Sequence, residues 1–85
     1  MYKILFQRVA VKQLRKVPMI SRQRITDKLY ALAKDPDNKK LDVKKISGES
    51  GFRLRVGDWR IIFDRKDSLK IIEIRKIGPR GGVYK

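Results

Sequence analysis

The sequence predicts an α+β fold in the order β-α-α-β-β-β: an N-terminal strand, a helical hairpin and a three-strand antiparallel meander. Apolar residues follow the helical period between residues 9 and 34, and they alternate with polar residues, as in a strand, between residues 52 and 63. Proline or glycine separates these segments. Because 85 residues can build only one thin core, we expect a single domain, 1–85, with both helices on one face of a four-stranded sheet.

The first strand is expected at residues 2–6, a short aromatic and β-prone run. A short amphipathic helix follows over residues 9–17, where apolar side chains recur at spacings of four and then three. Pro18 ends it, since a residue before proline avoids helical geometry. Ser21 is the expected N-cap of a second helix that runs to about Lys34. Its apolar stripe is Ile25, Leu29 and Leu32, with Ala33 beside it.

Breaker residues at 35–38 end the second helix, and we expect residues 39–45 to form a loop or irregular edge. Residues 46–51 are interpreted as a flexible lead-in to the meander, and residues 64–67 as a polar turn. The last strand is expected at residues 69–77, followed by an irregular tail over residues 78–85. Two core faces remain open for that strand: Ile72 with Ile74, or Leu69 with Ile71 and Ile77.

The segment from Gly51 to Phe63 contains two alternating runs separated by Gly57-Asp58, which predicts a β-hairpin with a two-residue loop. One face of this hairpin collects apolar side chains and is expected to join the core. With this loop length, the opposed pairs are Val56 with Trp59, Arg55 with Arg60, Leu54 with Ile61, Arg53 with Ile62 and Phe52 with Phe63.

The second face of the hairpin carries Arg53, Arg55 and Arg60. Like charges directly opposite one another destabilise a sheet by roughly 0.2–1 kcal/mol per pair, so folding alone gives no reason to oppose Arg55 and Arg60. One interpretation is a solvated face that happens to be basic. The alternative, which we favour, is that the three guanidinium groups converge on phosphate, which arginine binds through a planar, bidentate fork.

The charge balance indicates a polyanionic partner. The chain has 23 Lys and Arg against 9 Asp and Glu, a formal net charge of +14. Nucleic acid is the first candidate, an acidic protein the second and an anionic membrane the third. The absence of cysteine and histidine excludes disulfides, thiolate metal sites and histidine acid–base chemistry. We expect a cytoplasmic protein, since no apolar run approaches the length of a membrane span or signal peptide.

The helical hairpin, the segment 52–63, the Ile77-Gly78-Pro79-Arg80 motif and the terminal Val83-Tyr84 together resemble the RelE/ParE superfamily of type II toxins, most closely its RelE branch. The resemblance covers essentially the whole chain. It implies a metal-independent endoribonuclease, with no cofactor, that cleaves messenger RNA in the ribosomal A site. In that reaction the ribose 2′-hydroxyl attacks the adjacent phosphate and leaves a cyclic phosphate and a free 5′-hydroxyl.

By this resemblance, the candidate catalytic residues are Arg53, Arg55, Arg60, Arg80 and Tyr84. Arg60 would stabilise the pentacoordinate phosphate, Arg80 would act as a phosphate clamp or acid, and Tyr84 would stack on or orient the nucleotide. The two tail residues also have plainer interpretations, as a solvated charge and a tyrosine packed on the core.

The general base is left open by the sequence. Relatives with a lysine on the first hairpin strand can use it as the base, whereas arginine does not deprotonate in proteins. The candidates are a nearby lysine, Tyr84, a carboxylate such as Glu73, or no base at all, with positioning by the ribosome supplying much of the rate. Pro79 stands where many relatives have histidine.

Two other functions fit the same pattern: a ParE-like inhibitor of DNA gyrase, and a non-catalytic basic module that binds nucleic acid or protein. The resemblance also implies partners. These are an acidic cognate antitoxin that covers the arginines, and messenger RNA on the ribosome with its 16S rRNA. Operator DNA would be bound only through the antitoxin, and no membrane partner is expected.

Overall fold

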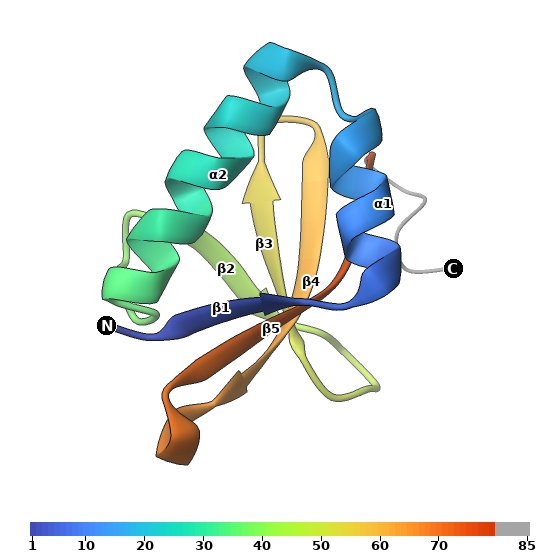
Figure 1. Cartoon of the computed structure of the whole chain (residues 1–85). Helices are drawn as coiled ribbons and strands as arrows, with labels where there is room; N and C mark the ends of the chain where they lie inside the picture. The colour runs from blue at the N-terminus through green and yellow to red at the C-terminus, as the bar shows by residue number, and fades with distance from the viewer. Residues whose placement is uncertain (80–85) are drawn as a thin grey trace.

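The computed structural model describes residues 1–79 and has the predicted order of elements with one strand added (Figure 1). The α+β prediction is confirmed, but the predicted number of strands is wrong, because the sheet has five strands in the order β1-β5-β4-β3-β2. β1 is parallel to β5, and the other neighbours are antiparallel. The elements are β1 (Lys3–Phe6), α1 (Arg8–Lys16), α2 (Met19–Lys34), β2 (Asp42–Lys45), β3 (Phe52–Val56), β4 (Trp59–Lys66), the 3₁₀ turn η1 (Asp67–Leu69) and β5 (Ile71–Pro79).

Both helices pack on the same face of the sheet, as expected, and the core lies between the two layers (Figure 1). The predicted stripe of the second helix is buried at all four positions. The apolar face of the hairpin also joins the core, with Trp59 and Phe52 partly buried at its ends. No helix within residues 1–79 is long and apolar enough to cross a membrane. The largest fully buried side chains are Phe63, Ile25, Leu32, Leu54, Ile61, Ile72, Ile74 and Ile77.

The second helix begins earlier than predicted, at Met19, and its N-cap is Pro18 instead of Ser21. The pyrrolidine ring fixes φ of Pro18 at −54°, which suits entry into a helix, and proline has no amide proton to leave unpaired there. Its carbonyl accepts the first helical hydrogen bond from the Arg22 amide at 2.8 Å. Ser21 therefore lies inside the first turn.

The additional strand, β2, lies within residues 39–45, which were predicted to be a loop or irregular edge. It pairs antiparallel with β3 at the edge of the sheet. This strand contributes little to the core, since Val43 is only partly buried and the other three residues are exposed. Two of those residues are lysines, a composition that discourages further strands from pairing with a sheet edge.

The predicted hairpin register is confirmed at all five pairs between β3 and β4. The loop is compatible with a type II′ turn, because φ is +58° at Gly57 and is not positive at Asp58. Glycine occupies the first central position of such a turn, where positive φ is required. A type I′ turn would favour the order Asp-Gly. The order Gly-Asp found here suits a type II′ turn instead.

The last hairpin differs from the prediction in its turn and its core face. Residues 64–66 continue β4 instead of forming a turn, and the chain reverses through η1 with Lys70 in the left-handed region. β5 extends to Pro79, past the predicted end. A β-bulge beside Ile62 and Phe63 shifts the pairing by one residue, so Ile72 and Ile74 face the core and Ile77 faces it again after the shift. The predicted face of Ile72 and Ile74 is therefore right, whereas the alternative face is right only at Ile77, because Leu69 is exposed in η1 and Ile71 is only partly buried.

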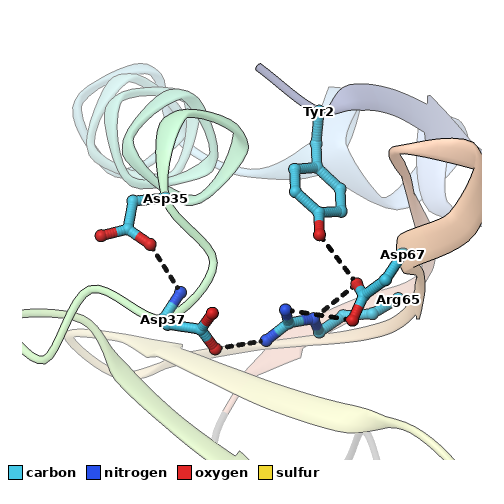
Figure 2. Close-up of polar contacts among 5 residues, drawn as sticks. All are labelled: Tyr2, Asp35, Asp37, Arg65 and Asp67. Carbon is cyan, nitrogen blue, oxygen red and sulfur yellow. Dashed lines mark hydrogen bonds and ion pairs between the residues drawn. The ribbon is translucent and has the colours of Figure 1, made fainter.

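Arg65 connects three segments on one side of the molecule (Figure 2). Its Nη1 donates to Oδ1 of Asp37, in the loop before β2, at 2.8 Å, and its Nε donates to Oδ1 of Asp67 at 3.0 Å. The Tyr2 hydroxyl donates to the same Asp67 oxygen at 2.9 Å, which joins the N-terminus to the cluster. Asp35 accepts the Asp37 amide and holds the loop in an Asx turn. The cluster thus anchors the chain that leads into β2.

Acid is expected to weaken this connection. Hydrogen bonding from Arg65 lowers the pKa of both Asp37 and Asp67 below the ordinary value for aspartate. A carboxyl group whose pKa is lower in the folded state stabilises the protein above its unfolded pKa, about 4, and that contribution is lost as the pH falls further. We therefore expect Arg65→Ala to lower the free energy of unfolding more at pH 7 than at pH 3, measured by urea denaturation. Arg15→Ala, on the exposed side of α1, should show no such pH dependence, and an equal loss at both pH values for Arg65→Ala would contradict this account.

Candidate phosphate-binding face

A transverse row of opposed residues from four strands crosses the face of the sheet turned away from the helices, and three of these residues carry side chains. Directly opposed residues point to the same side of a sheet. Asp42 of β2 is opposite Arg55, Arg55 is opposite Arg60 of β4, and Arg60 is opposite Gly78 of β5. We call these four residues the arginine row. The neighbouring positions on the same face are Lys44, Arg53, Ile62 and Lys76.

Arg53 is held closely against the sheet. Its side chain is only 11% exposed, and its Nη2 donates to Oδ1 of Asp42 at 2.8 Å. Its Nε is buried and has no hydrogen-bond partner among residues 1–79. A buried donor without a partner costs roughly 1–3 kcal/mol, so an acceptor supplied by a ligand would be favoured here.

Arg55 is more open, with 47% of its side chain exposed. Its Nε lies 3.9 Å from Oδ2 of Asp42, which is an ion pair beyond hydrogen-bond distance. Asp42 therefore faces two guanidinium groups, is hydrogen-bonded to one of them, and keeps one oxygen largely available.

Arg60 is the most buried charged residue within residues 1–79, at 7% exposure. Its single hydrogen bond there is a long one, from Nη1 to the carbonyl oxygen of Trp59 at 3.4 Å, and no carboxylate of those residues forms an ion pair with it. Removing a cation from water without a counterion opposes folding. Within residues 1–79, Arg60 is thus a buried cation without a counterion, which suits an anionic ligand.

A cleft of about 380 Å³ adjoins Arg53 on the side of the β2–β3 loop. Three cations and one carboxylate contribute to its walls, so the net charge of the lining is positive and favours an anionic group. Its lining residues are Lys44, Lys45, Ile46, Ser47, Glu49 and Arg53. It extends the basic surface beyond the arginine row.

Three of the predicted site residues, Arg53, Arg55 and Arg60, are brought together on one face of the sheet. Arg80 and Tyr84 lie outside the described residues, and their placement stays a prediction. Glu73, one candidate for the base, is ion-paired with Lys66 at 3.3 Å, and it lies five positions from the Gly78 end of the row along β5. No cluster of three or more carboxylates in the described chain is arranged to hold a metal ion.

The sequence reasoning missed Asp42, because it placed residues 39–45 in a loop. A signal was present: Leu41 and Val43 alternate with Asp42 and Lys44, which is the period of a strand. The run is short and rich in lysine, which obscured that alternation.

Comparisons with known proteins show which family the chain resembles. A family model described as the ParE toxin of the type II toxin–antitoxin system parDE matches residues 4–84. The RelE-RelB complex of Pyrococcus horikoshii OT3 contains a chain 30% identical to this one, with 95% of this chain and 97% of that chain covered and a TM-score of 0.82. The RelB-RelE complex of Methanococcus jannaschii gives 32% identity, 88% coverage of both chains and a TM-score of 0.75.

The RelBE2 complex of Mycobacterium tuberculosis, at 22% identity, 93% and 98% coverage and a TM-score of 0.80, shares the fold. No curated protein sequence matches the chain.

The burial of Arg60 leads to a prediction about stability. Replacing a buried ion pair by apolar side chains of similar volume is often neutral or stabilising by roughly 1–4 kcal/mol, and a buried charge without a partner is less favourable still. We expect Arg60→Met to raise the free energy of unfolding by about 1 kcal/mol, measured by urea denaturation in a buffer without phosphate or sulfate. The matched control is Arg55→Met, at the half-exposed neighbour, which should change stability by less than about 0.5 kcal/mol. A clear loss of stability in Arg60→Met would show that this guanidinium serves the fold.

Proposed function

The chain belongs to the RelE/ParE superfamily of type II toxins, in its RelE branch, and from this membership we propose that it is a metal-independent endoribonuclease that cleaves messenger RNA in the ribosomal A site. The observation that carries the proposal is the opposition of Arg55 and Arg60 on a sheet face that also holds Arg53, with Arg60 buried and not ion-paired within residues 1–79. Such an arrangement opposes folding and suits a phosphate.

Phosphate chemistry explains why these guanidinium groups are held in place before substrate arrives. When the 2′-hydroxyl attacks, negative charge develops on the phosphate oxygens. Donors that are already positioned stabilise this charge without reorganising. In the proposed roles, Arg60 stabilises the pentacoordinate phosphate, and Arg53 and Arg55 bind the phosphate oxygens. Arg80 as a second clamp or acid and Tyr84 as a base-stacking residue complete the proposed site.

Arg53 and Arg55 are partly neutralised by Asp42 in the protein alone. A bound phosphate would take over that counterion role through charge-assisted hydrogen bonds, which arginine forms with phosphate in bidentate geometry. The ribosome would position the reacting groups of the RNA, by presenting the A-site codon in a fixed conformation.

An acidic antitoxin is the proposed protein partner. The similar structures from P. horikoshii and M. jannaschii are complexes of RelE with RelB. A chain with net charge +14 favours association with an acidic segment, and such association weakens as salt increases. We propose that the antitoxin covers the face that bears the arginines and so prevents RNA from binding.

Inhibition of DNA gyrase is the second candidate function, because the matching family model is that of the ParE toxin. A gyrase inhibitor has no need for guanidinium groups converging on one phosphate. Supercoiling by purified gyrase in the presence of the protein separates this function from RNA cleavage.

The cleavage proposal predicts the effect of removing Arg60. We expect Arg60→Ala to slow cleavage roughly 10²–10³-fold, the loss measured when one preorganised donor is removed from an enzyme site. The measurement is primer extension on a defined messenger RNA in a reconstituted translation reaction, with ribosomes stalled at a known codon. Cuts should fall in the A-site codon and require ribosomes.

The matched control is Arg15→Ala, which removes the same charge from the exposed side of α1 and should cleave at the wild-type rate. Equal cleavage by wild type and Arg60→Ala would refute the site. No cleavage by folded wild-type protein, with inhibition of gyrase, would replace the proposed function by the second candidate.

A separate prediction concerns the antitoxin. Co-expression with the product of the neighbouring reading frame should restore growth of cells that produce the toxin, and the purified complex should dissociate more readily as salt is raised. Arg55→Glu, which reverses a half-exposed charge in the arginine row, should weaken the complex, whereas Arg15→Glu should not. Growth that is not restored, or a complex insensitive to both salt and Arg55→Glu, would count against an acidic partner on this face.

A further inference from the structure

Asp42 is the carboxylate of the arginine row, and its two oxygens have different surroundings. Oδ1 accepts a hydrogen bond from Nη2 of Arg53 at 2.8 Å, which fixes the orientation of the group. Oδ2 is 3.9 Å from Nε of Arg55, and 46% of the side chain is exposed. An ionised carboxylate has about four sites that can accept a hydrogen bond, so Oδ2 can accept one from a ligand.

The proposed cleavage needs a group that accepts the proton of the attacking 2′-hydroxyl. The chain has no histidine, and arginine stays protonated in proteins. A lysine would have to lose a proton before it could act, whereas the Asp42 carboxylate is an acceptor held in place by two arginines. A fixed, accessible carboxylate beside phosphate-binding guanidinium groups therefore meets the requirement for a general base.

We propose that Asp42 is the general base of this site, an inference that rests on the proposed ribonuclease function. Oδ2 removes the proton of the ribose 2′-hydroxyl while the 2′ oxygen forms a bond to the adjacent phosphorus. The bond from that phosphorus to the 5′ oxygen of the next nucleotide breaks, and the 5′ oxygen takes a proton from water. The products are a 2′,3′-cyclic phosphate and a 5′-hydroxyl, and Asp42 returns its proton to the solvent.

The order of residues across the sheet supports this assignment. Neighbouring strands are about 4.8 Å apart, so the backbones of Asp42 and Arg60 are separated by about 10 Å, with Arg55 between them. This spacing leaves room for a 2′-hydroxyl next to the carboxylate and a phosphate between the guanidinium groups. The charged groups that face Asp42 are Arg53 and Arg55 from β3, the strand beside it, and Lys44 from its own strand.

Other carboxylates on this side of the molecule are less suited to the role. Glu73 is paired with Lys66 at 3.3 Å, and Asp64 with Arg75 at 3.1 Å, both away from the arginine row. Glu49 lines the cleft beside Arg53 but forms no ion pair with an arginine among residues 1–79. Glu49 is therefore the main alternative to Asp42 as the base.

The test is Asp42→Asn, which keeps an oxygen for the Arg53 hydrogen bond and removes the basic group. Cleavage of the A-site codon on stalled ribosomes would be followed under single-turnover conditions over a series of pH values. We expect cleavage to be slower by roughly 10²–10⁴-fold, the usual contribution of general acid–base catalysis. The fall in rate on the acid side, which wild type should show as its base becomes protonated, should be absent. Asp27→Asn, which removes a carboxylate from the exposed surface of α2, should keep both the rate and the pH profile of wild type.

Asp42→Glu, which restores a carboxylate at the same position, should recover much of the lost rate, and this recovery separates chemistry from a general fault in folding. The inference is overturned if Asp42→Asn cleaves at the wild-type rate or faster, or if it is slow but keeps the acid-side fall. It is also overturned if Glu49→Gln produces the loss instead. No cleavage by wild-type protein, under conditions where another RelE-type toxin cleaves the same ribosomes, would reject the proposed function itself.

Discussion

The antiparallel pairing of β3 with β4 decides where the charged side chains of this protein lie. Leu54, Ile61 and Phe63 are completely buried on the helix side of this pair. Because side chains alternate along a strand, slipping the register by one residue would place these apolar groups in water and the arginines in the core. The hydrophobic effect thus holds Arg55 opposite Arg60 even though their charges repel. The geometry of the proposed site is a consequence of how the other face packs.

The same arrangement explains why the site opposes folding. Two opposed guanidinium groups and a buried Arg60 each raise the energy of the protein without a ligand. In a small domain the margin of stability is narrow, so such features persist only where the core compensates for them. Here the compensation comes from α2 and the three central strands β3, β4 and β5, which contribute all eight of the largest fully buried side chains. An anion on the arginines would relieve the repulsion, and so a bound partner would also stabilise the fold.

The elements with strong periodicity could be predicted from the sequence. The apolar stripe of α2 and the alternation across Gly57-Asp58 each depend on local pattern alone, and both correspond to the structure in detail. The parts that could not be predicted depend on distant contacts. β2 has only one partly buried apolar residue and is a strand because β3 offers it an edge. The shift in β5 arises from a bulge against β4, which no pattern within β5 itself reveals. Of the candidate site, the three arginines followed from the hairpin, whereas Asp42 required the β2 pairing.

The edge position of Asp42 suits a group with two successive tasks. Before RNA arrives, its carboxylate offsets the charge of Arg53 and Arg55 and keeps the two guanidinium groups in place. A phosphate that binds the same arginines replaces this counterion, which frees the carboxylate to accept a proton. Asp42 lies on the edge strand β2 and remains half exposed, so a ligand can reach its free oxygen. Substrate binding and activation of the base would then be coupled through the arginines that they share.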